Sequence, residues 1–194
     1  MVQPAERADA RANRTRLLNA ALAVLAERGA GAEIREIAER AGLAVGTVYN
    51  HFPSKDDLIL AVIDRARDEF DQVLTDALAQ PDPLAGLRLF VRQSLAIVDR
   101  YGDVMNLLLQ RRAAVHLPEA DPRIAAFRER SAELVARAVR AGLLRSDIDS
   151  EVAVAVLRAT FLPWVFADLR RNRTPEEIAD ALMAIFLDGA RRAE

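Results

Sequence analysis

Small polar and aromatic side chains gather in one short stretch of the chain, residues 45–52. Thr47, Tyr49, Asn50 and His51 lie within it, and four such groups on a short helix exceed what solubility requires. Amides, hydroxyls and imidazoles can form the hydrogen bonds that base edges offer in the DNA major groove. If this stretch is helical, these groups could contact bases or phosphates.

The sequence lacks the motifs of the common enzyme classes. Neither histidine, His51 or His116, has the glutamate three residues earlier that a helical di-iron site needs. No Gly-x-Ser-x-Gly, Gly-x-x-x-x-Gly-Lys-Ser/Thr or Gly-x-Gly-x-x-Gly pattern occurs, so serine hydrolysis and nucleotide chemistry have no recognisable site. There is no cysteine, which excludes disulfides and thiolate ligands. We therefore predict no enzyme, no metal site and no cofactor.

Three helices are predicted to position the polar stretch. Residues 14–29 carry apolar side chains at helical spacing and end on a glycine that suits a C-cap. A second helix, residues 33–40, closes on Gly42, and the third spans residues 45–52. Two short helices joined by a three-residue turn that contains glycine form a helix-turn-helix.

Positive charge is concentrated at the start of the chain, at Arg7, Arg11, Arg14 and Arg16. Residues 1–55 hold eight Lys and Arg against six Asp and Glu, a net +2, although the whole chain has a net charge of −2. A basic arm can neutralise DNA phosphates. A solvated, frayed terminus explains the same composition equally well.

The composition favours an all-α protein of one domain, or of a small module and a larger one. Hydrophobic residues make up 52% of the 194 residues, whereas aromatic residues make up only 5%. Alanine, leucine and arginine, which favour helices, are abundant. The polar, arginine-rich start does not resemble a secretory signal, and no apolar run approaches the length of a membrane span. We expect a cytoplasmic protein that does not bind membranes.

The remainder of the chain is predicted to be a helical body, giving about nine helices in total. A long amphipathic helix follows Ser54, which can cap it, and ends before Pro81. Pro163 should kink the eighth helix. The other predicted helices span residues 84–100, 103–115, 122–141, 150–171 and 175–191.

The helix-turn-helix segment resembles a known family. The residues that carry the resemblance are Ile37-Ala38, Ala41-Gly42, Gly46-Thr47, Tyr49, His51-Phe52, Ser54-Lys55 and Leu58. Over about residues 14–62 this pattern is similar to the DNA-binding signature of the tetracycline-repressor (TetR) family. One departure is Glu33, which stands where the family usually has a threonine that caps the second helix.

The resemblance implies that the helix of residues 45–52 docks in the major groove. The residues that it places at DNA are Arg35, Val45, Gly46, Thr47, Tyr49, Asn50, His51 and Lys55. Each position has a plainer alternative. Arg35 could pair with Glu39, Lys55 could neutralise a neighbouring aspartate, Tyr49 could be a packing residue, and His51 could be an ordinary surface histidine.

The helical body is predicted to form a dimer and to bind an effector. The helix of residues 150–171 carries more apolar residues than one buried stripe can use, and the helix of residues 175–191 has apolar residues at helical spacing. The resemblance implies that these two helices from each of two subunits form a four-helix dimer interface. The predicted interface residues are Val154, Leu157, Ile178, Leu182, Ile185 and Phe186. The predicted ligand-binding residues are Phe90, Met105, Leu108, Leu109, Arg112, His116, Phe127, Phe161 and Trp164.

Together these features predict a DNA-binding domain at residues 1–54 and an effector-binding and dimerisation domain at residues 55–194. The predicted function is a ligand-responsive transcriptional regulator, most simply a repressor. It would bind palindromic double-stranded operator DNA as a homodimer and be released by a small, largely apolar effector. The alternative is a helical small-molecule-binding protein without sequence-specific DNA binding.

Overall fold

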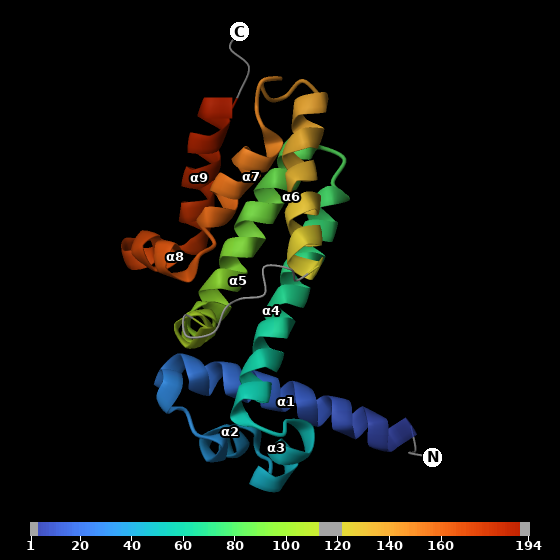
Figure 1. Ribbon diagram of the computed structural model, residues 1–194, viewed down its shortest axis with the longest axis vertical. Coiled ribbons are helices and arrows are strands. Elements are labelled where there is room, and N and C mark those ends of the chain that lie inside the picture. Colours follow the sequence, from blue (N-terminus) through green and yellow to red (C-terminus); the bar gives the residue numbers. More distant parts are fainter. Residues whose placement is uncertain (1–3, 113–121, 191–194) are drawn as a thin grey trace. The chain divides into compact units, whose positions relative to one another are not determined.

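The computed structural model describes the backbone of residues 4–112 and 122–190, and the side chains of residues 7–107 and 122–189. Every regular element in these ranges is a helix, which confirms the predicted all-α class (Figure 1). The α-helices are α1 (Pro4–Arg28), α2 (Ile34–Ala41), α3 (Val45–His51), α4 (Lys55–Leu78), α5 (Pro83–Arg112), α6 (Pro122–Arg140), α7 (Ser150–Ala159), α8 (Pro163–Leu169) and α9 (Pro175–Ala190). Two 3-10 turns, η1 (Gly29–Gly31) and η2 (Arg170–Asn172), follow α1 and α8.

The chain forms two compact units. The first consists of the described parts of residues 1–66 and 103–115, and the second of the described parts of residues 67–102 and 116–194. Helices α4 and α5 therefore each contribute residues to both units. The domain boundary expected after residue 54 falls at the start of α4, whereas the division between units falls within that helix.

The first unit has its core where α1, α2 and α3 meet the start of α4. Helix α1 contributes buried residues at i, i+4 and i+7, namely Leu17, Ala21 and Val24. Ile37 of α2 and Val48 of α3 are fully buried as well. The spacing of these apolar residues is the reason why the sequence predicted the helices correctly. Helix α1 differs in one respect, because it starts at Pro4 and so includes the arginine-rich stretch.

Helix α5 is one continuous helix where the sequence predicted two, residues 84–100 and 103–115. The break was expected at Tyr101-Gly102, because glycine often ends a helix. Tyr101 is instead fully buried, and its hydroxyl group donates a hydrogen bond to Glu69 Oε1 on α4 at 2.5 Å. A glycine inside a helix costs only about 1 kcal/mol, so packing of Tyr101 suffices to keep the helix intact.

The predicted helix of residues 150–171 is divided into α7 and α8. The axes of α7 and the segment from Pro163 to Asn172 differ by 66°. Pro163 is the first residue of α8, a position where the missing N–H leaves no hydrogen bond unmade. The proline therefore starts a new helix, whereas the sequence predicted a kink within one.

The second unit is held together by an apolar core and by ion pairs between its helices. Arg92 of α5 pairs with Asp180 of α9 at 2.8 Å, and Arg123 of α6 pairs with Asp68 of α4 at 2.7 Å. The backbones of α4 and α5 approach closely at Gly86, where a Cβ atom would lie 2.5 Å from the carbonyl oxygen of Ala77. A side chain at position 86 would thus force these helices apart.

Candidate functional site

The turn between α2 and α3 is fixed by contacts from α1. Gly42 has φ 64° and ψ 40°, a left-handed conformation that ends α2, and the Leu43 N–H donates to the carbonyl oxygen of Ala38 at 3.0 Å. Arg16 of α1 donates to the carbonyl oxygens of Ala41 and Gly42, at 2.6 and 3.2 Å. A cation at the negative end of the α2 dipole is favourable, so Arg16 sets where the turn begins.

The start of α2 is capped without the threonine that the TetR resemblance led us to expect. The Glu36 carboxylate accepts a hydrogen bond from the backbone N–H of Glu33 at 3.0 Å, and α2 begins at the next residue. The two guanidinium nitrogens of Arg40 donate to the two carboxylate oxygens of Glu27, at 2.9 and 2.8 Å. This hydrogen bonding from Arg40 lowers the pKa of Glu27 and joins α1 to α2.

Helix α3 buries one side and exposes the residues predicted to contact DNA. Val48 is fully buried, whereas Tyr49 is 51% exposed. Val45, Gly46 and Asn50 are exposed, and Thr47 and His51 are half-buried. A Cβ atom at Gly46 would meet no atom within 4 Å. The fold therefore does not require glycine at this exposed position, which is consistent with a requirement from a closely approaching ligand.

Arg35 and Lys55 have partners within the protein. The Arg35 guanidinium lies 3.3 Å from the Glu39 carboxylate, and both side chains are well exposed. The Lys55 ammonium donates to the carbonyl oxygen of Ala30 at 2.8 Å, which ties the first residue of α4 to η1. The Arg35 contact agrees with the plainer alternative, whereas sequence reasoning named neither a carbonyl partner nor η1 for Lys55. Their contact with DNA stays a prediction.

Ser54 caps α4 as predicted. Its hydroxyl oxygen accepts a hydrogen bond from the Asp57 N–H at 3.1 Å. Because Lys55 and Ser54 adjoin the end of α3, their contacts fix the chain direction directly after the exposed helix. The site in the first unit is thus a short helix with one exposed face, held by η1, α1 and α4.

Three of the predicted ligand-binding residues belong to an aromatic cluster in the second unit. Phe90 and Phe161 pack edge to face with ring centroids 5.5 Å apart. Phe127 lies 6.2 Å from Phe90 and, edge to face, 6.2 Å from Phe70, which sequence reasoning missed. Phe90 is fully buried, whereas Phe70 and Phe127 are only half-buried. The cluster is therefore not completely closed by the described residues.

The other predicted ligand-binding residues are not brought to this cluster. Trp164 is 51% exposed on α8, and Met105 is half-buried in the part of α5 that belongs to the first unit. His116 and the side chains of Leu108, Leu109 and Arg112 lie outside the described residues.

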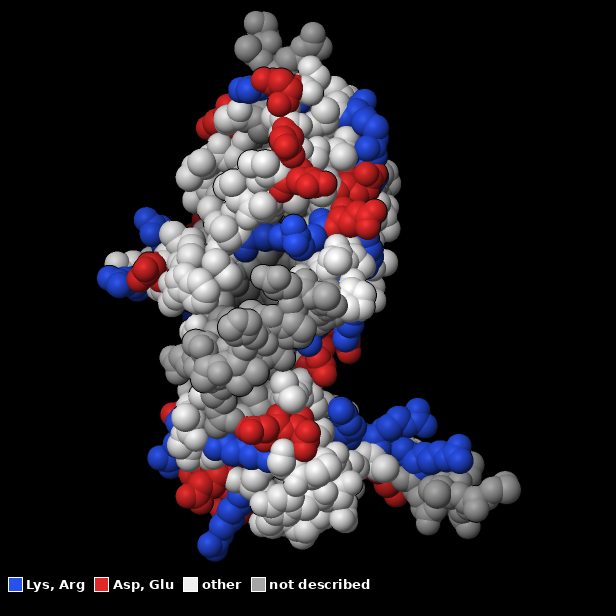
Figure 2. Space-filling model, in the orientation of Figure 1, with Lys and Arg blue, Asp and Glu red and all other residues white. Residues whose placement is uncertain are grey.

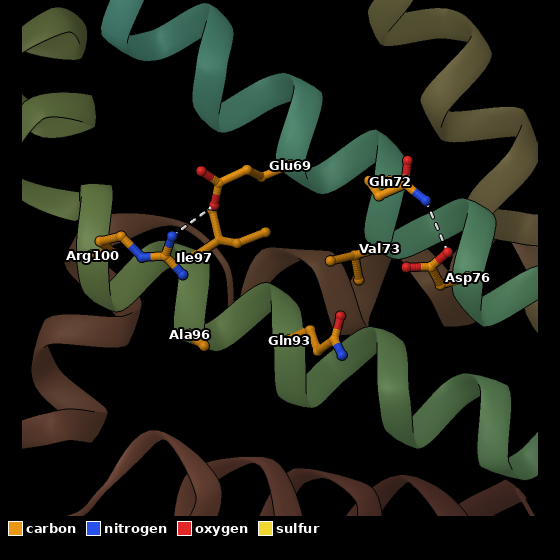
Figure 3. A pocket seen from close by; sticks show the side chains of 8 residues that line it. All are labelled: Glu69, Gln72, Val73, Asp76, Gln93, Ala96, Ile97 and Arg100. Carbon is orange, nitrogen blue, oxygen red and sulfur yellow. Dashed lines mark hydrogen bonds and ion pairs between the residues drawn. The ribbon is translucent and has the colours of Figure 1, made fainter. Parts of the chain in front are cut away.

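An open groove of about 270 Å³ lies between α4 and α5 (Figure 3). Of the ligand-binding residues named above, none whose side chain is described lines it; Gln93, which the sequence also suggested as a possible polar anchor, does. The Gln72 amide donates to Asp76 at 2.8 Å, and Arg100 pairs with Glu69 at 2.9 Å, as the dashed lines of Figure 3 mark. The remaining lining residues are Val73, Gln93, Ala96 and Ile97. Much of the polar lining of the groove is therefore already paired.

The predicted dimer residues fall into two groups. Val154, Leu157 and Ile178 are buried within the chain itself and offer no surface to a partner. Leu182 and Phe186 are half-buried, and Ile185 is 72% exposed. The apolar pattern located α7 and α9 but could not distinguish the inner from the outer face of α7. Its exposed positions at i, i+3, i+4 and i+7 are Val152, Ala155, Val156 and Ala159.

Within the described ranges, His, Asp and Glu do not form a group of three or more that could hold a metal ion. In the same part of the chain, no single helix is long and apolar enough to cross a membrane. The bent pair of α7 with the segment Pro163–Asn172 meets that test by length and composition only.

The fold and the exposed short helix define a helix-turn-helix DNA-binding regulator. Residues 17–62 match the model of the bacterial regulatory proteins of the tetR family. The chain is 31% identical, over 191 residues, to the transcriptional repressor KstR2 of Rhodococcus jostii, and the match covers 91% of this chain and 90% of that protein. The protein belongs to the TetR family of transcriptional regulators.

Solved structures agree with this assignment. A TetR transcriptional regulator of Streptomyces coelicolor has a TM-score of 0.68 and 26% identity, and the match covers 93% of this chain and 99% of that one. The structure of AibR in complex with isovaleryl coenzyme A and operator DNA has a TM-score of 0.67 and 23% identity, over 89% of this chain and 97% of AibR.

Proposed function

We propose that the protein represses transcription by binding a palindromic operator as a homodimer, and that a small, largely apolar effector releases it. The observation that carries the DNA-binding part is α3. Its outer face presents Val45, Gly46, Tyr49 and Asn50 to solvent while Val48 anchors it in the core. A helix of this kind can enter the major groove and place its side chains against base edges.

The exposed face of α7 supports the homodimer. Val152 and Val156 are 59% and 62% exposed, and alanines fill the remaining positions of this face. On α9, Ala181, Ala184 and Ile185 form a second exposed apolar face. Two exposed apolar faces in one chain suit an isologous two-fold interface with a second copy, and a two-fold dimer matches two half-sites about one helical turn apart.

The aromatic cluster supports the effector site better than the α4–α5 groove does. Half-buried phenyl rings give an apolar ligand an incompletely closed binding surface, whereas much of the polar lining of the groove is already paired. We place the apolar part of the effector against Phe70 and Phe127.

A polar anchor for the effector lies beside this cluster. Arg158 of α7, one turn before Phe161, is half-buried and donates to the neutral hydroxyl oxygen of Ser131 at 3.1 Å. Burial, together with repulsion from Arg128, lowers the pKa of Arg158. A half-buried cation whose hydrogen-bond partner is neutral favours an anion, so the effector carries one anionic group. AibR, which has the same fold, is described with isovaleryl coenzyme A.

Release of the operator would occur through α4, which contributes residues to both units. An effector that contacts Phe70 can shift the equilibrium only by its differential affinity for the two arrangements of α4. Only three residues, 52–54, separate the end of α3 from the start of α4, so a displacement of α4 would be passed to the reading helix.

The test is equilibrium binding to duplexes from the DNA that flanks the protein's own gene, with scrambled duplexes of equal length as controls. We expect a preference of at least about 10³-fold for one flanking duplex at physiological salt. Salt-sensitive binding without any sequence preference would contradict the proposed function as a repressor. It would favour the alternative, a helical small-molecule-binding protein.

A further inference from the structure

The N-terminal half of α1 extends beyond the core of its unit. The first buried residue of the helix is Leu17, and from Arg7 to Arg16 every side chain is exposed except Asn13, which is half-buried. At 1.5 Å per residue, the thirteen residues 4–16 extend about 20 Å. Residues 7–12 are all exposed, so the described start of this extension does not pack into the core of the unit.

Three arginines lie on one side of this extension. Arg7, Arg11 and Arg14 are spaced at i, i+4 and i+7, which places them on one helical face. The Arg11 Nε donates to the carbonyl oxygen of Arg7 at 3.3 Å, and the Arg14 guanidinium lies over the ring of Phe52. Neither contact neutralises a charge. Figure 2 shows basic side chains gathered over this part of the molecule.

The other arginines near the helix-turn-helix are used differently. Arg28 pairs with Glu36, Arg35 with Glu39 and Arg40 with Glu27. The unit thus neutralises arginines around α2 with carboxylates, whereas no carboxylate among the described side chains forms an ion pair with the row on α1. Like charges one turn apart repel each other, so this row is unfavourable unless an anion covers it.

The row is connected to the reading helix. The guanidinium carbon of Arg14 lies 5.0 Å from the ring centroid of Phe52, and Phe52 is the residue that ends α3. From this contact the row runs outward along α1, through Arg11 to Arg7. A polyanion bound along the row would therefore extend outward from the molecule that α3 contacts.

We propose that Arg7, Arg11 and Arg14 form a second DNA-binding site, which takes the phosphates that flank the segment read by α3, without regard to sequence. This site rests on the proposed function, because α3 must bring duplex DNA to the row. From Arg7 to Arg14 the row spans seven residues, about 10 Å at 1.5 Å per residue. This length corresponds to about three base pairs at 3.4 Å each. The row can therefore follow the phosphate backbone over a few base pairs next to the segment read by α3.

The experiment compares wild type with the double variant Arg7→Gln, Arg11→Gln. Arg14 is kept because it packs on Phe52. Dissociation constants are measured against salt concentration, for a flanking duplex with the operator and for a scrambled duplex of equal length. Each lost phosphate contact lowers the slope of log K against log salt by about 0.9. The double variant removes two arginines from each subunit of the dimer, so we expect a decrease of about 3.6 on both duplexes, with the preference between them unchanged.

A matched control removes the same charge elsewhere. Arg88 and Arg173 are exposed arginines of the second unit, so the double variant Arg88→Gln, Arg173→Gln should keep the wild-type slope. As a second measurement, the operator duplex is shortened until only the part read by α3 remains. The difference between wild type and the α1 variant should then disappear.

Equal slopes for wild type and the α1 variant would overturn the proposal. A reduced slope of the α1 variant that persists on the shortened duplex would also overturn the proposal, because the arginines would then act within the half-site. The failure of the proposed function is distinguishable: wild type would bind both duplexes equally, while the change of slope on α1 substitution would remain. If wild type binds neither duplex, both proposals fail.

Discussion

The guanidinium of Arg16 donates a hydrogen bond of 2.6 Å to the carbonyl oxygen of Ala41, which joins the middle of α1 to the end of α2. The same nitrogen also reaches the carbonyl oxygen of Gly42, where the turn to α3 begins. A Cβ atom at Gly42 would lie 3.1 Å from this nitrogen. The position of α3 therefore depends on a contact between a side chain and a turn that share no sequence motif.

Gly42→Ala should destabilise the protein for two reasons. A left-handed φ costs a residue with a side chain about 1–2 kcal/mol, and the new Cβ would disturb Arg16. Gly29→Ala is the matched control, because Gly29 also has a positive φ, 56°, but has no atom near a Cβ position. Thermal unfolding should show a larger loss for Gly42→Ala, and an equal loss would mean that Arg16 adapts without cost.

Gly46→Ala should separate folding from DNA binding. The Cβ would enter open space, and alanine favours a helix over glycine by up to about 1 kcal/mol, so the melting temperature should stay or rise. Operator affinity should fall because the methyl group keeps the backbone of α3 away from DNA. Equal affinities of Gly46→Ala and wild type for the operator would show that α3 does not approach DNA closely at this residue.

Val156→Asp should produce a monomer. Val156 is 62% exposed in the single chain, so the substitution buries no charge within its fold, but it places a carboxylate in the proposed interface. Ile124→Asp on α6, where the side chain is 46% exposed, serves as the control and should remain dimeric. Light scattering after gel filtration reports the mass. If the Val156→Asp protein has the mass of the wild-type dimer, α7 is not part of the interface.

Arg158→Gln should weaken anionic effectors selectively. Titration calorimetry measures the binding, because Trp164, the single tryptophan of the chain, is half-exposed on α8 outside the aromatic cluster. A hydrogen bond to a charged group contributes about 1.5–3 kcal/mol, so decanoate should bind at least about tenfold more weakly to the variant. Decanol should bind the variant and wild type alike. Equal losses for decanoate and decanol would show that Arg158 does not recognise charge. Arg88→Gln controls for loss of a surface arginine.

The sequence predicted the helix-turn-helix well because its signals are local. Apolar spacing, the glycine at position 42 and the serine cap at position 54 act within a few residues of one another. The helical body after residue 54 was predicted less well, because packing between helices determines where its helices begin and end. Tyr101 keeps α5 continuous through its contact with Glu69, and the need for glycine at position 86 arises only from the approach of α4.

Apolar patterns also could not tell which faces of the helices remain open. Val154 and Val156 belong to the same run of valines, yet the first is buried and the second exposed. The Lys55 contact with Ala30 was likewise beyond prediction, because it joins residues 25 positions apart through a backbone carbonyl that carries no sequence signal.

Footprinting of the wild-type protein on the DNA that flanks its own gene tests the central claim most directly. A two-fold dimer that reads DNA with α3 should protect two half-sites of symmetric sequence, with centres about 10 base pairs apart or a multiple of that distance. An apolar anionic effector, with decanoate as the probe, should remove both protections together. A single protected site without internal symmetry, or no discrete protection at any concentration, would contradict the claim.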